Sequence, residues 1–505
     1  MTALIVLAAV AAAVPAALRW LRVAQREHYL PGSVTRFAWR WWTSTPLNVF
    51  IGVATVVAVV AAWVWHPAVG AVALVAVAAG PVGLLPKGRT SKLAWTRRLR
   101  ALTATTVLVA VLAVSGGWLA GVAAPLAVTA AVLVPALVDA ALLAVLPIER
   151  QAASRYVEEA AAALRRVDPV VVAITGSYGK TTTKGYVRHL LSGSVRVVAS
   201  PASFNNTAGL SRAVNEGLSA GTEVFVAEMG TYGPGEIRDL CAWVQPGVSV
   251  ITAIGPVHLE RMGSIENIVA AKSEILESTE VAVLNVDAPY LADVAARAAT
   301  RMEVVRCSAT DASADVLVRR EGEQLSVLVR REKLTSIRAD AHPTNVACAL
   351  GVAVALEVPL GEVAPRLATL PAAPNRQQVS TSPRGVVVVD DTFNANPAGA
   401  AVAIDLLKRH ASRGRRRAVV TPGMVELGAT QYGENAALAA AASRAATDLV
   451  VVGRTNRRAL LEGARHGPAT VHVVDNREEA VEWVRANLGP GDGVLYENDL
   501  PDHYP

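Results

Sequence analysis

Long apolar runs dominate the first part of the chain, whereas shorter apolar runs separated by polar stretches follow it. Before residue 149, five long runs can be drawn, which are residues 3–18, 47–65, 68–85, 101–114 and 118–146. A membrane-spanning helix needs about 20 apolar residues, within a range of roughly 17–25. Since the first and fourth runs are short and the fifth is long, the pattern predicts about five transmembrane helices, give or take one.

Short β-branched runs recur from residue 168 onward and alternate with helix-like stretches. Segments such as "PVVVAITG", "EVFVAEMG" and "VAVLNVD" are continuously apolar, as strands buried on both faces are. A second series begins at "RGVVVVDD", after the proline-rich stretch 370–378, which we interpret as a hinge. This alternation predicts α/β domains with mostly parallel sheets. We therefore expect an α-helical membrane domain (1–148), a central α/β ATP-binding domain (149–370) and a C-terminal Rossmann-like α/β domain (371–505).

Charge gives the predicted helices an orientation. The chain is 52% hydrophobic with a mean hydropathy of +0.36, too apolar for an ordinary soluble protein. Basic residues collect in two loops, 19–40 and 87–100, which the positive-inside rule places in the cytoplasm. The N-terminus is then outside, and a multi-pass plasma-membrane protein with cytoplasmic α/β domains is expected. The net charge of +6 lies mainly in these loops and indicates no nucleic-acid partner, while three scattered cysteines indicate neither disulfides nor zinc.

The segment "TGSYGKTT", residues 175–182, is a glycine-rich loop between a buried strand and a predicted helix. Glycines let backbone amides approach phosphate oxygens, and the helix adds its positive N-terminal end. Lys180 can reach the β- and γ-phosphates of ATP, and the Thr181 hydroxyl can ligate Mg²⁺. We expect the nucleotide to contact the whole loop, namely Gly176, Ser177, Tyr178, Gly179, Lys180, Thr181 and Thr182.

This loop resembles the ATP loop of the Mur ligases, and further motifs follow in that family's order. "VAEMGTYGPGEI" places Glu228 like the family's strand-end glutamate, which holds Mg²⁺. "GPVHLERMGSIENIVAAKSEI" resembles a Mur segment nearly throughout. By that resemblance His258 serves a second Mg²⁺, and Lys272 reacts with CO₂ to form a carbamate, which converts a cation into a carboxylate that a hard cation prefers. The implied metal set is Thr181, Glu228, His258 and carbamylated Lys272.

Three later motifs resemble nucleotide-binding elements of the same family. "DAHPTNVACAL" implies that Asn345 lies on the adenine side, and "APNRQQV" implies that Arg376 reaches the ATP phosphates. "VVDDTFNANPAGA" implies that Asp391 holds the ribose and that Asn394 and Asn396 shape the site. This last motif is similar to that of the Mur branch that adds D-alanyl-D-alanine to a UDP-linked tripeptide.

The resemblance covers roughly residues 168–498 and implies ATP-dependent amide formation through an acyl phosphate. The implied catalytic residues are Lys180, Lys272, His258, Glu228 and Arg376, with ATP and Mg²⁺ as cofactors and a carboxylate and an amine as substrates. Two regions depart from the family. Membrane helices stand in place of the UDP-sugar-binding domain, and "LYENDLPDHYP" replaces the usual "K-G-S" ending of the D-alanyl-D-alanine branch.

We interpret the chain as a membrane-bound peptide ligase of cell-wall precursor, peptide-polymer or natural-product synthesis. The alternative is a membrane-anchored ATP-binding sensor or assembly protein without ligase turnover, although a pure binding protein would not require the two-metal set. The helices leave three interpretations open: a lipid-linked substrate or product, a membrane partner such as a flippase or exporter, and anchoring in the bilayer alone.

Overall fold

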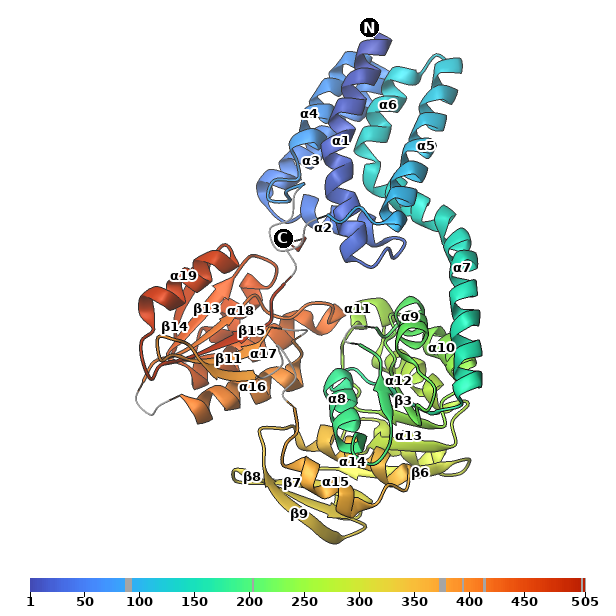
Figure 1. The fold of residues 1–505 in the computed structure, drawn as a ribbon. Coiled ribbons are helices and arrows are strands. Elements are labelled where there is room, and N and C mark those ends of the chain that lie inside the picture. Colours follow the sequence, from blue (N-terminus) through green and yellow to red (C-terminus); the bar gives the residue numbers. More distant parts are fainter. Residues whose placement is uncertain are drawn as a thin grey trace. The chain divides into compact units, whose positions relative to one another are not determined.

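The computed structural model describes residues 1–86, 93–201, 204–371, 378–392, 395–411, 415–500 and 503–504. The chain forms two compact units. Unit 1 comprises Met1–Ala152 together with Leu500–Pro505, and unit 2 comprises Ala153–Asp499. Figure 1 labels the helices and strands of both units.

Unit 1 is helical, as its apolar runs predict. Its elements are α1 (Thr2–Arg26), α2 (Ser33–Trp42), α3 (Pro46–Val64), η1 (Pro67–Gly70), α4 (Ala71–Ala79), α5 (Arg97–Leu119), α6 (Ala123–Val132) and α7 (Val134–Val167), the last of which continues into unit 2. By length and composition, α1, α3 and α5 could each cross a membrane. A fourth span is possible if α6 and residues 134–149, bent by 80° at their junction, count as one.

The described part of unit 1 therefore has three or four candidate spans, and a count of four lies within the prediction of five give or take one. The difference arises at the third predicted run, 68–85, where the helix η1–α4 ends at Ala79. The buried Arg19 guanidinium donates to the carbonyl oxygens of Val77 (3.2 Å) and Ala78 (2.7 Å) at the end of α4, and to that of Leu84 (3.0 Å). Because a side chain from α1 satisfies these carbonyl groups, the backbone can leave the helix without losing hydrogen bonds.

The first sheet of unit 2 has nine strands in the order β2-β3-β1-β4-β5-β6-β7-β8-β9. It is parallel from β2 to β7, and β8 and β9 add an antiparallel hairpin. The strands are β1 (Val170–Thr175), β2 (Val197–Ala199), β3 (Val224–Glu228), β4 (Val248–Ile251), β5 (Val281–Asn285), β6 (Glu303–Ser308), β7 (Val316–Glu321), β8 (Gln324–Val329) and β9 (Glu332–Arg338).

Successive side chains of β1 point to opposite faces of the sheet, and both sets are apolar. Helices therefore cover both faces. Val172 and Ile174 enter one core, and Val171 and Ala173 enter the other. The helices are α8 (Lys180–Leu191), α9 (Thr207–Gly217), α10 (Glu236–Val244), α11 (Leu259–Met262), α12 (Ile265–Ser273), η2 (Glu274–Leu276), α13 (Leu291–Ala298), α14 (Pro343–Ala355) and α15 (Leu360–Leu367).

The second sheet of unit 2 has six strands in the order β10-β11-β15-β12-β13-β14, and only β10 is antiparallel to its neighbour. The predicted α/β alternation is thus confirmed for both sheets. The elements are β10 (Gln378–Thr381), β11 (Val387–Asp391), α16 (Pro397–His410), β12 (Arg417–Thr421), η3 (Gly428–Thr430), α17 (Gln431–Ala445), β13 (Asp448–Val452), α18 (Arg457–Ala464), β14 (Thr470–Val474), α19 (Arg477–Asn487) and β15 (Gly493–Glu497).

Candidate active site

The glycine-rich loop connects β1 to α8 and follows a path that side chains would obstruct. Gly176 has φ +150°, and a Cβ there would lie 2.1 Å from the Thr252 hydroxyl oxygen. Gly179 has φ +79°, and a Cβ there would lie 2.4 Å from Asn345 Oδ1. The Thr252 hydroxyl donates to the Tyr178 carbonyl oxygen, which ties the loop to the residues after β4. The two glycines therefore permit a close approach of the backbone that other residues would prevent.

Lys180 begins α8, where the N-terminal end of the helix favours negative charge. Its ammonium group donates to the Gly176 carbonyl oxygen at 2.6 Å and so closes the loop on itself. The loop is thus held by its own cation in a form that encloses a small space. Backbone amides, a helix N-terminus and a lysine together are the groups that bind phosphate.

Glu228 ends β3 beside this loop and is almost completely buried. The Thr181 hydroxyl donates to Glu228 Oε1 at 3.1 Å, and the Lys184 ammonium lies 2.9 Å from Oε2. Burial alone would raise the pKa of this carboxyl, but the charges of Lys184 and Lys180 outweigh burial and lower it. Glu228 is therefore an ionised carboxylate at the phosphate loop.

The sequence analysis missed Lys184, although one signal for it exists. Lys184 follows Lys180 by four residues, so both lie on the same face of α8. Lys184 is itself buried and also donates to the Pro201 carbonyl oxygen at 3.1 Å. It places a second positive charge beside the expected metal-binding carboxylate.

His258 lies just before α11 and has φ +61°. Its Nδ1 is hydrogen-bonded to Glu426 Oε2, and Arg261 Nη2 lies 2.8 Å from Glu426 Oε1. Burial is the main cause that lowers the pKa of His258, so its ring is neutral at pH 7. Glu426 belongs to the segment 422–428 in the domain of the second sheet and was not among the predicted site residues.

Lys272 occupies the last turn of α12 and is 4% exposed. Among the described residues it forms no ion pair. Burial, followed by the positive charge of Lys180, lowers the pKa of Lys272 well below its ordinary value. This shift increases the fraction of neutral amine, which is the form that reacts with CO₂.

The expected metal set is only partly supported by these contacts. Thr181 and Glu228 present a hydroxyl and a carboxylate oxygen side by side, which suits a hard cation such as Mg²⁺. No cluster of three or more histidine, cysteine, aspartate and glutamate side chains suited to a metal ion occurs in the described ranges. The roles of His258 and Lys272 as further metal ligands stay predictions.

A cavity of about 540 Å³ opens beside the loop and falls within the 300–1,000 Å³ typical of small-ligand sites. Both α/β domains of unit 2 contribute to its lining. The predicted site residues that line it are Tyr178, Gly179, Thr182, Asn345, Asp391 and Asn396. Other polar lining residues are Thr252, Asn285, Asp287, Asp340, His342, Thr344 and Gln378. Arg376 and Asn394 lie outside the described residues.

Glu497 is a further buried acid that the sequence analysis did not single out. It ends β15 and pairs in register with Asp391 at the end of the neighbouring strand β11. Its side chain is fully buried, and neither carboxylate oxygen has a hydrogen-bond partner among the described residues. Burial and the nearby Asp391 raise the pKa of Glu497 well above its ordinary value. The signal available in the sequence was the departure of "LYEND" from the family's usual lysine-containing ending.

Comparisons with known proteins match this part of the chain. The profile described as Mur ligase middle domain matches residues 174–353, and that described as Mur ligase, glutamate ligase domain matches residues 375–496. The UDP-N-acetylmuramoyl-tripeptide–D-alanyl-D-alanine ligase of Mycobacterium bovis is 33% identical over 357 residues, covering 64% of this chain and 69% of that protein. The ligase of the same name from Bacillus subtilis is 27% identical over 344 residues, covering 67% and 75%.

Two solved structures have the same fold as this part of the chain. MurF from Acinetobacter baumannii superposes with a TM-score of 0.61 at 24% identity, covering 69% of this chain and 77% of that one. The MurF ligase of Thermotoga maritima, solved in complex with ADP, superposes with a TM-score of 0.58 at 24% identity, covering 69% and 80%.

Proposed function

Because this chain belongs to the Mur ligase family, we propose that it is an ATP-dependent, ADP-forming ligase that joins a carboxylate to an amine while anchored in a membrane. One observation carries this proposal. The phosphate loop, with Lys180 and the Thr181–Glu228 contact, adjoins a cavity that both α/β domains line. The names of the relatives above describe an enzyme of the same reaction class acting on UDP-N-acetylmuramoyl-tripeptide and D-alanyl-D-alanine.

The proposed reaction has two steps. A substrate carboxylate oxygen attacks the γ-phosphorus of ATP, and the bond from this phosphorus to the β–γ bridging oxygen breaks. The products are ADP and an acyl phosphate of the substrate. An amine nitrogen then attacks the acyl carbon, loses a proton, and inorganic phosphate leaves as the amide forms. Lys180 would release the Gly176 carbonyl oxygen and pair with the β- and γ-phosphates, where negative charge spreads during transfer. Arg376 would add a second positive charge.

Thr181 and Glu228 would hold Mg²⁺, which when bound neutralises phosphate charge. Lys184 would keep Glu228 ionised and oriented, since it already pairs with the oxygen that Thr181 does not contact. His258 and Lys272, as a carbamate, would complete a second cation site. The burial of Lys272 and its lowered pKa support this role, because both favour the neutral amine that reacts with CO₂.

We place the enzyme in the synthesis of a cell-wall precursor or a related peptide polymer. The amine would be a small amino acid or dipeptide, and the carboxylate would belong to a peptide on a carrier. Unit 1 supplies three or four apolar helices that would hold the enzyme in the plasma membrane, with unit 2 on the cytoplasmic side where ATP is available.

The decisive experiment measures ADP release by the full chain in detergent with Mg²⁺-ATP, with and without an extract of lipids and metabolites, and with and without bicarbonate. We expect ADP only when extract is present, less ADP when bicarbonate and CO₂ are removed, and a loss of about a hundredfold or more in Lys180→Ala. A ¹³C carbamate resonance from ¹³CO₂-treated protein, absent in Lys272→Ala, would report the modification directly.

Other outcomes would contradict the proposal. Equal ADP release without extract would indicate an ATPase that joins nothing. Bound ATP without ADP release under every condition would favour a membrane-anchored nucleotide sensor or assembly protein.

A further inference from the structure

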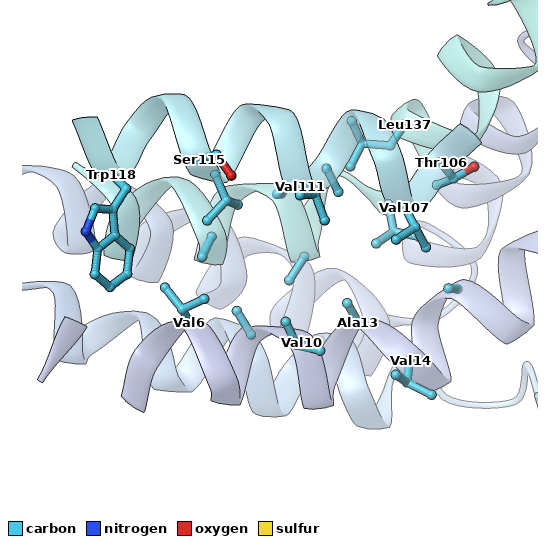
Figure 2. A pocket seen from close by; sticks show the side chains of 18 of the residues that line it. Val6, Val10, Ala13, Val14, Thr106, Val107, Val111, Ser115, Trp118 and Leu137 are labelled. Atoms are coloured by element: carbon cyan, nitrogen blue, oxygen red, sulfur yellow. The ribbon is translucent and has the colours of Figure 1, made fainter. Parts of the chain in front are cut away.

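Unit 1 contains an apolar groove of about 840 Å³ that helices α1, α5, α6 and α7 line (Figure 2). Figure 2 shows Val6 and Ala13 on α1 facing Val107 and Val111 on α5 across the groove. The complete lining is Val6, Ala9, Val10, Ala13, Val14, Ala17, Thr106, Val107, Ala110, Val111, Val114, Ser115, Trp118, Leu119, Ala127, Ala130, Ala131, Val134 and Leu137. We call this set the lateral groove.

The lateral groove is open to the surroundings of unit 1. Val10, Val107 and Val111 are each more than half exposed. Of the lining residues only Thr106, Ser115 and Trp118 carry a polar side-chain group, and the Thr106 hydroxyl already donates to the Leu102 carbonyl oxygen at 2.8 Å. A groove with this lining offers hydrocarbon contacts and almost no hydrogen bonds.

Positive charge lies at one end of the lateral groove. Val107, Val111, Val114 and Trp118 follow Arg100 by 7, 11, 14 and 18 residues, so Arg100 shares their face of α5. Arg97 precedes Arg100 by three residues and lies on the neighbouring part of that face. Both arginines are exposed in the first turn of α5, whose N-terminal end also favours an anion. Arg100 lies about 9 Å along the helix from Thr106, the nearest groove residue on α5.

These features together match one class of ligand. We propose that the lateral groove binds a phosphate-bearing lipid, with one hydrocarbon chain between α1 and α5 and its phosphate at Arg97 and Arg100. The apolar lining accounts for the chain, and charge complementarity at the N-terminal turn of α5 accounts for the head group. This inference does not depend on ligase turnover.

The test measures lipid binding to the full chain in detergent. Native mass spectrometry would follow titration with phosphatidylglycerol and, separately, with phosphatidylcholine, whose head group carries no net charge. We expect preferential retention of phosphatidylglycerol. Filling the groove with Val111→Trp or Ser115→Phe should reduce binding about tenfold or more, and Arg100→Gln should weaken it about fivefold.

Matched controls separate the site from general contact with lipid. Val57→Trp changes an exposed apolar residue of α3 outside the groove, and Arg165→Gln removes an exposed arginine of unit 2. Both should bind phosphatidylglycerol like the unaltered chain, and every variant should retain ATP binding as evidence of folding.

Equal retention by groove and control variants would overturn the groove as the binding site. Equal retention of the two lipids would overturn the charge complementarity between the head group and Arg97 and Arg100. Specific lipid binding without ADP release would leave this inference standing while contradicting the proposed function.

Discussion

At the scale of single residues, the candidate site is organised by buried charge. Glu228 stays ionised because Lys184 and Lys180 offset its burial, whereas Lys272 tends to the neutral amine because burial and Lys180 both disfavour its charge. Similar burial thus has opposite consequences for charge, depending on the sign of the neighbours. In Glu497, as in Lys272, burial and the charge of a neighbour, here Asp391, both disfavour the charged form.

The raised pKa of Glu497 predicts a pH dependence of stability. Between the ordinary carboxyl pKa near 4.5 and the higher folded value, the folded chain binds more protons than the unfolded chain. The contribution of Glu497 to the free energy of unfolding is therefore fully present below the ordinary carboxyl pKa. This contribution is lost as the pH rises through the pKa of Glu497 in the folded chain. At pH 8 we expect the free energy of unfolding of Glu497→Gln to exceed that of the unaltered chain by about 1 kcal/mol or more. At pH 4 we expect little difference between the two.

Thermal unfolding between pH 4 and pH 9 would measure this effect, with the exposed Glu478→Gln as control. A loss of stability in Glu497→Gln at every pH would mean that Glu497 is ionised and holds a cation.

At the scale of secondary-structure elements, helix α12 positions Lys272. The Ser264 side chain caps this helix by accepting a hydrogen bond from the Asn267 amide at 3.2 Å. Ile268, Ala271 and Lys272 face the interior, so the helix end that bears the lysine is fixed by packing as well as by the cap.

Removing the cap should weaken this element in a measurable way. We expect Ser264→Ala to lower the free energy of unfolding by about 1 kcal/mol, because the Asn267 amide loses its acceptor. Hydrogen exchange of the α12 amides should accelerate as well, and Ser264→Asn, which retains an acceptor, should restore slow exchange. Unchanged exchange in Ser264→Ala would show that packing alone holds the helix.

At the scale of the whole molecule, the chain leaves unit 1 near Ala152 and its last residues, 500–505, belong to unit 1 again. His503 is buried there, with Nε2 lying 2.9 Å from Glu27 Oε1, and its carbonyl oxygen accepts from the Trp41 indole at 2.8 Å. Phe37 lies against both His503 and Tyr504, with ring centroids 5.0 Å apart in each pair. Unit 1 is therefore completed by residues from the far end of the sequence.

This arrangement predicts that the tail stabilises unit 1. We expect His503→Ala to lower the free energy of unfolding by about 2 kcal/mol, since it removes a buried hydrogen-bond partner of Glu27 and the ring that packs against Phe37. The tail should also become a faster substrate for carboxypeptidase. His466→Ala changes an exposed histidine of unit 2 and should alter neither measurement. A fully stable, protease-resistant His503→Ala would show that the His503 side chain does not hold the tail on unit 1.

The sequence by itself determined the helical first part, the α/β alternation, the phosphate loop and the family, because each depends on residues close together in the chain. Apolar runs and periodicity report burial, and a contiguous loop places its own backbone around a phosphate. Gly80 and Pro81 already favour a helix end after Ala79. Only the tertiary structure shows that Arg19 reaches from α1 to the carbonyl groups at that end. The tertiary structure also decided which residues pair with His258 in the site and with His503 in unit 1. His258 meets Glu426 across 168 positions and His503 meets Glu27 across 476, and such pairs depend on how distant elements pack rather than on any local pattern.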